Sequence, residues 1–257
     1  MSAPPPPHLP PVHISCPIRS KYTKDTNLDI TQELEATIPL PEIADQNCAS
    51  VLISNGERII ESNEGKVQCV RCEKFLKPEL LTAHYNSHST QILPWLYLGG
   101  QINAKNYTEL TKRTDIKHIL NCAHECSPLF PEEFQYYSIN LYDNATQDLT
   151  EAFDYGVKLL DEMSKKGENI LIHCVQGLSR SASIVIAYLM IHHKMSLIEA
   201  YTFVKMRRPL VKPNPGFIVQ LLALEEKLYG SVTLEVSEIY CKCQLPPQNN
   251  EICVCNI

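Results

Sequence analysis

An apolar run at residues 170–172 leads into a histidine and a cysteine, and an arginine follows the cysteine by six positions. An ionised Cys174 is a strong nucleophile, and the planar guanidinium of Arg180 can bind two oxygens of a phosphate at once. A loop between them, at the amino end of a helix, would direct backbone N–H groups inward and bind an anion. The predicted phosphate-binding residues of this loop are Val175, Gln176, Gly177, Leu178 and Ser179.

The same surroundings favour the ionised form of the sulfur. A helix amino end and a nearby cation stabilise a thiolate over a thiol, so we expect Cys174 to be a nucleophile without a separate base. The alternative is a small buried core residue, as most free cysteines are. We favour the catalytic interpretation because a core cysteine does not carry His, Gly, Ser and Arg at this spacing after a strand.

The segment His173-Cys174-x-x-Gly177-x-Ser179-Arg180-Ser181-Ala182 resembles the signature of dual-specificity protein phosphatases. The resemblance extends over residues 92–230 and includes the segments 96–99, 119–121, 187–190 and 208–221. It implies an α/β fold with a mixed, largely parallel sheet flanked by helices, and hydrolysis through a phosphocysteine intermediate. It also implies that Ser181 donates a hydrogen bond to the departing thiolate and that His173 braces the loop.

Such a reaction needs an acid, because expelling an alkoxide or phenolate without a proton is costly. Asp143 follows an apolar segment and precedes the cysteine by about thirty residues, as the acid of the family does. Asp148 is the rival in the same loop. We favour Asp143, because Asp148 has the position of a cap for a helix beginning near Thr150.

The predicted substrates are phosphoproteins. A domain of roughly 140 residues leaves no room for the longer recognition segment of tyrosine-only phosphatases, so a shallow cleft for phosphotyrosine, phosphoserine and phosphothreonine is implied. Lipid phosphatases of the wider superfamily carry basic residues inside the loop. Here Val175, Gln176 and Leu178 are neutral, which favours proteins.

Alternating strands and helices must position these residues. Ser196 with Glu199 forms a capping box, Asn214 followed by proline begins the last helix, and Gly230 ends it. Strands are predicted at 95–98, 116–121, 137–141 and 169–173. The inward stripe of the last helix is predicted to be Phe217, Leu221, Leu224 and Leu228.

A second constellation lies upstream. Its residues have the types and spacing of a tetrahedral zinc site and resemble a Cys-Cys-His-His finger, with Phe75 and Leu81 as its apolar positions and one residue missing before Phe75. The alternative is a chance arrangement. The expected structural zinc ligands are Cys69, Cys72, His84 and His88.

The finger is not expected to read DNA. The positions that contact bases in such fingers are here Lys77, Leu80 and Ala83, and two of these three cannot pair with base edges. We expect the finger to dock a protein partner or to stiffen the arm. The tail residues Cys241, Cys243, Cys253 and Cys255 leave a second zinc site open, against free or redox-active thiols.

The net charge of −6 and the pI near 5.9 give no general attraction to nucleic acid or to anionic membranes. We find no signal peptide and no apolar run long enough to cross a membrane, so we expect a cytoplasmic or nuclear protein.

A phosphoprotein-binding module on an inactive phosphatase fold, or a nucleic-acid-associated adaptor, is the competing interpretation. The predicted segments are a mostly disordered proline-rich arm (1–60, with a hairpin within 51–60), the finger (61–90), the catalytic domain (91–230) and a cysteine-rich tail (231–257).

Overall fold

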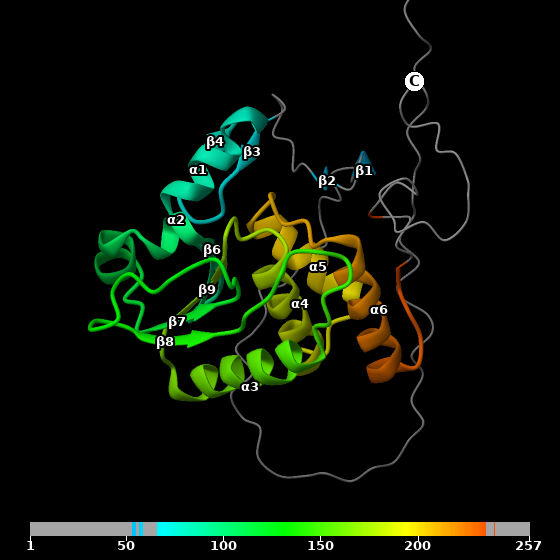
Figure 1. Cartoon of the computed structure of the whole chain (residues 1–257). Coiled ribbons are helices and arrows are strands. Elements are labelled where there is room, and N and C mark those ends of the chain that lie inside the picture. Colours follow the sequence, from blue (N-terminus) through cyan, green and yellow to red (C-terminus); the bar gives the residue numbers. More distant parts are fainter. Residues whose placement is uncertain (1–52, 55–56, 59–65, 235–238, 240–257) are drawn as a thin grey trace, which may run out of the picture. The chain divides into compact units, whose positions relative to one another are not determined.

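A five-stranded sheet forms the centre of the computed structural model, which describes residues 53–54, 57–58, 66–234 and 239 (Figure 1). The strand order is β5-β6-β9-β7-β8. All neighbouring strands are parallel except β5 and β6, so the sheet is mixed and largely parallel, as predicted. The strands are β5 (Thr90–Leu93), β6 (Leu96–Gly100), β7 (His118–Asn121), β8 (Gln135–Ser138) and β9 (Ile170–Cys174).

Strand β9 lies at the centre and ends at the cysteine of the signature. All five of its residues are buried, as expected for a central parallel strand covered on both faces. Cys174 pairs in register with Gly100, and His173 pairs with Asn121. The carboxyl ends of three parallel strands therefore meet at one edge of the sheet, where ligands bind in open α/β sheets.

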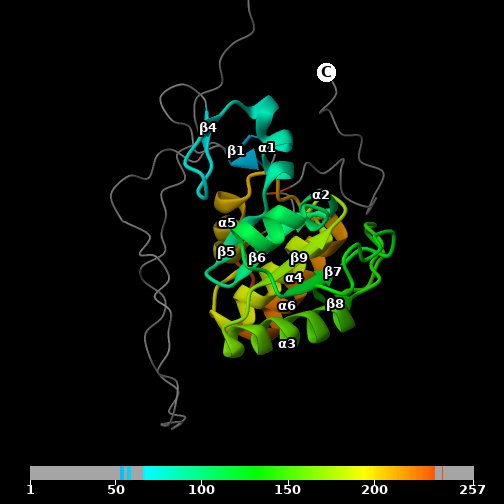
Figure 2. The same ribbon diagram turned by 90° about the vertical axis from the view of Figure 1, so that its left-hand side faces the viewer.

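Helices cover both faces of the sheet. Helix α4 packs on β6 and β9, and the helices α3, α5 and α6 each pack against α4 (Figure 2). The other face is covered by α2 and a π-helical turn. Ala104 of α2 and Leu110 of the π turn pack in one cluster with Leu171 of β9. The helices are α2 (Gln101–Ala104), the π turn (Glu109–Arg113), α3 (Thr150–Lys166), α4 (Arg180–His192), α5 (Leu197–Arg207) and α6 (Pro215–Tyr229). Among the described residues, no helix is long and apolar enough to span a membrane.

The predicted helix ends are confirmed. Ser196 and Glu199 form the capping box of α5, Asn214 accepts a hydrogen bond from the backbone of Phe217, and Gly230 adopts the left-handed conformation after α6. The predicted stripe of α6 is wrong at Leu228, which is 37% exposed. The buried position one turn after Leu221 is instead taken by Glu225, because its carboxylate accepts the backbone N–H of Leu197 at the start of α5.

The strands differ from the prediction at two places. Strand β8 is at Gln135–Ser138 rather than 137–141, since the chain leaves the sheet after Ser138 and turns toward the cavity described below. Strand β5 was not predicted, because it is short and mixes polar with apolar residues before a proline. Its antiparallel pairing with β6 makes the sheet mixed.

A small module precedes the sheet. It contains β3 (Val67–Gln68), β4 (Phe75–Leu76), a 3-10 turn (Pro78–Leu80) and α1 (Leu81–Ser87). Phe75 was expected in its core but is 53% exposed, and Leu76 is buried in its place. The reason is strand alternation: β3 pairs with β4 so that Val67 faces Leu76 on the inner side, and Phe75 then points outward. The core of the module is Val67, Cys69, Leu76, Leu81 and Tyr85.

The predicted hairpin within 51–60 is present, with β1 (Ile53–Ser54) antiparallel to β2 (Glu57–Arg58). The rest of the arm, residues 1–52, lies outside the described residues. So do the four tail cysteines Cys241, Cys243, Cys253 and Cys255. Disorder of the arm and a second zinc site therefore stay predictions.

Candidate active site

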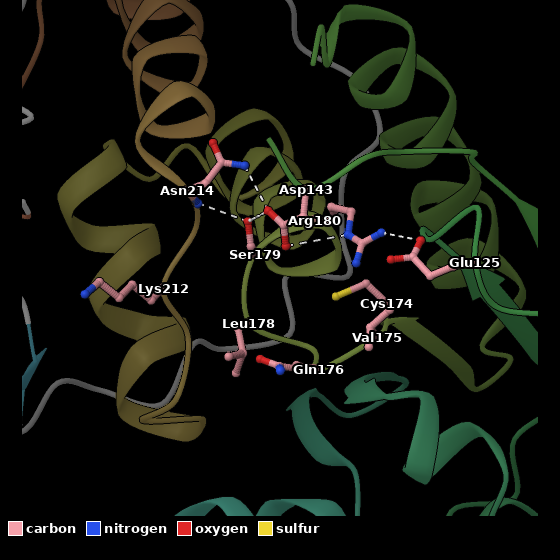
Figure 3. Close-up of a pocket in the computed structure, with 10 residues that line it drawn as sticks. All are labelled: Glu125, Asp143, Cys174, Val175, Gln176, Leu178, Ser179, Arg180, Lys212 and Asn214. Carbon is pink, nitrogen blue, oxygen red and sulfur yellow. Dashed lines mark hydrogen bonds and ion pairs between the residues drawn. The ribbon is translucent and has the colours of Figure 1, made fainter. Parts of the chain in front are cut away.

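A cavity of about 370 Å³ opens where β9 ends (Figure 3). It combines the cysteine, the arginine and the aspartate that were predicted for the site with a glutamate, a lysine and an asparagine that were not predicted to belong to it. The lining residues are Glu125, Asp143, Cys174, Val175, Gln176, Leu178, Ser179, Arg180, Lys212 and Asn214.

Two donors surround the sulfur of Cys174, which is 1% exposed. The backbone N–H of Gly177 lies 3.2 Å from Sγ, and the hydroxyl of Ser181 lies 3.3 Å from it. Hydrogen bonds to the charged form of a group favour that form. Two hydrogen-bond donors therefore converge on this sulfur.

The residues between the cysteine and the arginine, 175–179, are called the phosphate loop below. The carbonyl oxygens of its residues are held from outside the loop, by the backbone N–H of Gln101 and Lys212 and by the side chain of Arg208. With the carbonyls turned outward, backbone N–H groups can face the cavity, which is the arrangement of an anion cradle.

Gly177 makes the tight turn of this loop. Its φ is +71°, and a Cβ atom there would lie 2.3 Å from the carbonyl oxygen of Gly99. Both the conformation and the close approach to β6 therefore require glycine.

The guanidinium of Arg180 is held by hydrogen bonds from NH1, whereas its Nε makes none. Its side chain is 4% exposed, and NH1 donates to Glu125 Oε2 at 2.7 Å and to the carbonyl of Leu141 at 3.0 Å. Its Nε is buried and has no hydrogen-bond partner. A buried N–H without a partner is costly, so this donor is suited to an incoming oxyanion.

Glu125 was missed in the sequence, although it follows the carboxyl end of β7 at the same edge of the sheet. The hydrogen bond from Arg180 lowers the pKa of Glu125 below its ordinary value, so its carboxylate is ionised at neutral pH. Its carboxylate holds the guanidinium of Arg180 in place.

Asp143 and Asp148 have different surroundings. Asp143 lines the cavity, with Oδ2 3.6 Å from Arg180 Nε and with Oδ1 accepting from Ser179 Oγ at 2.7 Å and from Asn214 Nδ2 at 2.9 Å. Asp148 is exposed, and its Oδ1 accepts both the backbone N–H and the hydroxyl of Thr150 at the start of α3. Only Asp143 therefore lies where it could reach a bound ester.

His173 lies behind the loop and does not line the cavity. Its side chain is buried, and its Nδ1–H donates to the carbonyl of Cys174 at 3.2 Å. Burial lowers the pKa of His173 to about 4, so the ring is neutral at physiological pH. His173 therefore supports the backbone at Cys174 from behind the loop.

The four metal-binding candidates of the small module, called the Cys/His cluster below, come together with their ligand atoms all within 4.8 Å of one another. Cys69 Sγ lies 3.7 Å from His88 Nε2, and Cys72 Sγ lies 3.5 Å from His84 Nε2. Tetrahedral zinc with ordinary bond lengths would set a sulfur and a nitrogen about 3.6 Å apart. The Nδ1–H of His88 donates to the carbonyl of Ser89, which leaves Nε2 free to bind a metal. The residues therefore fit a four-coordinate metal ion.

Comparisons with known proteins agree on the family. Residues 96–227 match the dual specificity phosphatase catalytic domain. Dual specificity protein phosphatase 1B of Arabidopsis thaliana is 37% identical over 142 residues, which is 55% of this chain and 84% of that protein. Human DUSP28 has a similar crystal structure, with a TM-score of 0.52 and 28% identity over 55% of this chain and 98% of that one.

Some relatives are much longer. Protein phosphatase Slingshot homolog 3 of Homo sapiens is 37% identical over 142 residues, yet the matched part is only 21% of that protein. For the MAP kinase phosphatase with leucine-rich repeats protein 3 of Dictyostelium discoideum the share is 19%. The family match runs from β6 to α6 and includes the phosphate loop, and by that match the chain belongs to the dual specificity phosphatase family.

Proposed function

We propose that this chain hydrolyses phosphotyrosine, phosphoserine and phosphothreonine in proteins through a phosphocysteine intermediate. In the first step the thiolate of Cys174 attacks phosphorus, the ester P–O bond breaks, and Asp143 gives its proton to the leaving oxygen. In the second step water attacks phosphorus, Asp143 takes the proton of that water, and the S–P bond breaks to release phosphate and the thiolate.

The observation that carries this proposal is the convergence of complementary groups on one cavity. The sulfur has two donors aimed at it, Arg180 lines the same cavity with a buried Nε that has no hydrogen-bond partner, and the Asp143 carboxylate lies 3.6 Å from that Nε. A preorganised cluster of donors stabilises developing negative charge without reorganisation during the reaction.

The composition of the phosphate loop supports protein substrates over lipid substrates, which would need basic residues inside the loop. The phosphate loop presents Val175, Gln176 and Leu178, none of which is charged. Lys212 also lines the cavity and is the basic residue there besides Arg180.

Substrate trapping tests the proposed chemistry. Asp143→Ala should retain phosphoproteins that are released by vanadate, because the substrate still binds but the leaving group receives no proton. Cys174→Ser serves as the control, since it cannot form the covalent intermediate. Turnover of a chromogenic phosphate ester by Cys174→Ser at the wild-type rate would contradict the mechanism.

We also propose that the Cys/His cluster binds one structural zinc ion and that the module can dock a protein partner. The ligand distances support the first part, and the exposed apolar side chains Val70, Phe75 and Leu80 support the second. Elemental analysis of the full chain should find zinc, and Cys72→Ser should contain one zinc fewer per molecule than the wild type.

A further inference from the structure

One buried arginine joins the metal module to the phosphate loop. Arg208 is 0% exposed and donates from Nε to the carbonyl of Gly177 at 2.9 Å and from NH2 to the carbonyl of Gln176 at 3.0 Å. Its NH1 points the other way, 3.4 Å from the carbonyl of Tyr85 and 3.3 Å from Thr90 Oγ1. The same guanidinium thus holds both the loop and the end of α1.

A second side chain makes a parallel connection. Asn103 is fully buried and donates from Nδ2 to the carbonyls of Tyr85 and Asn86, at 3.1 and 3.0 Å. Its Oδ1 accepts the backbone N–H of Gly100 at 2.8 Å, and Gly100 pairs in register with Cys174. Helices α1 and α2 pack side by side, which brings these groups together (Figure 1).

The carbonyls that both side chains bind belong to residues between two members of the Cys/His cluster. Tyr85 and Asn86 follow His84 and precede His88. Helix α1 has only seven residues, and a helix this short is not stable on its own. A metal ion held by His84 and His88 would fix the backbone between them, and hence the acceptors of Arg208 and Asn103.

Loss of these acceptors would change the conformation of the phosphate loop. Arg208 is held by neutral oxygens in the contacts described above, and a buried cation whose acceptor moves away is strongly destabilised. Movement of Arg208 to recover an acceptor would release the carbonyls of Gln176 and Gly177. The N–H of Gly177 is the one that points at the sulfur of Cys174.

We propose that a metal ion in the Cys/His cluster positions the phosphate loop through Arg208 and Asn103, so that metal occupancy sets the affinity of the cavity for an oxyanion. This inference rests on the proposed phosphatase site and gives the module a role in that site. Arg208 contacts the phosphate loop, and Asn103 contacts Gly100 in the strand beside it. Neither side chain lines the cavity, so both are positioning residues.

Tungstate binding to the full chain, measured by calorimetry, tests the coupling without requiring turnover. Cys72→Ser changes the exposed ligand and should lose the metal and weaken tungstate binding about tenfold, as supporting contacts around metal and ligand sites typically do. Thr82→Ser, at an exposed position of α1 that is not a ligand, should keep both the metal and the affinity. Removal of zinc by a chelator should weaken tungstate binding in the wild type by the same factor, and added zinc should restore it.

Arg208→Lys is the second test of the coupling. It should keep the metal, weaken tungstate binding about tenfold and lower kcat more than it changes KM for a small phosphate ester, whereas the neighbouring Arg207→Lys should match the wild type. Arg207 packs over Phe203 instead of the loop. In the double variant Cys72→Ser/Arg208→Lys the two losses should not multiply, because both act through one chain of contacts.

Three results would overturn the inference: a wild-type chain purified with zinc that contains none, equal tungstate affinity with and without metal, or losses that multiply in the double variant. A failure of the phosphatase proposal looks different. In that case the loaded wild type would not hydrolyse any phosphate ester, although tungstate affinity could still follow the metal.

Discussion

Two regions of this molecule bring cysteine and histidine together, and they surround the sulfurs with opposite kinds of group. At the start of the phosphate loop, the sulfur of Cys174 receives N–H and O–H donors in a cavity that a guanidinium also lines. In the Cys/His cluster two sulfurs face imidazole nitrogens at 3.5 and 3.7 Å. Donors and a cation prepare a sulfur to attack, whereas lone pairs that converge on one point prepare it to bind a metal ion. The partners of a thiol, rather than the thiol itself, decide which chemistry it can do.

The largest difference between the regions should appear when each loses one sulfur. Cys174→Ser should lower kcat by at least about 10⁴-fold, because removing a nucleophile removes the covalent route. The loss from Cys72→Ser should be far smaller, because that thiol acts only through the loop. Steady-state kinetics on a chromogenic phosphate ester measure both, and losses of equal size would erase the distinction.

The acid gives the next largest effect. Asp143→Ala should lower kcat by about 10²–10⁴-fold with little change in KM, because a positioned acid contributes this much to leaving-group departure. Asp148→Ala is the matched control and should stay near the wild-type rate, since its carboxylate caps α3 outside the cavity. A larger loss in Asp148→Ala than in Asp143→Ala would reverse the assignment.

A pair of glycines sharpens the contrast between a functional turn and a structural one. Gly177→Ala should destabilise the fold by about 3 kcal/mol or distort the loop, because the new Cβ would meet the backbone of Gly99. Gly167 has a similar positive φ of +66° but open space around it, so Gly167→Ala should cost only about 1 kcal/mol. Chemical denaturation compares the two variants, and equal losses would mean that the contact with Gly99 is unimportant.

The smallest expected effect concerns pH. The pKa of buried His173 is about 4 in the folded chain and near 6.5 when unfolded, so the unfolded chain binds more protons between these values. Stability from this group is complete above pH 6.5 and falls as the pH is lowered toward 4, by about 2 kcal/mol at pH 5. The free energy of unfolding of His173→Asn should therefore fall less between pH 7 and 5 than that of the wild type. An identical fall in both proteins would show that His173 does not contribute.

Much of the fold around the site could be predicted because its signals are local. The apolar run that becomes β9, the caps of α5 and α6 and the turn glycine at Gly177 all depend on neighbours within a few residues. Errors arose where two neighbouring apolar residues competed for one inward direction, as with Phe75 and Leu76. Leu228 was misplaced for a related reason, since a buried carboxylate that caps another helix took the inward position.

The sequence by itself determined the order of strand, loop and helix that sets Cys174 and Arg180 six residues apart, because backbone conformation over such a short stretch follows from the residues within it. Only the tertiary structure decided which distant groups meet them. Glu125 reaches Arg180, and Arg208 connects the loop to Tyr85, through packing of elements that lie far apart in the chain. No short-range pattern encodes such contacts, because they depend on how whole helices and strands fit together.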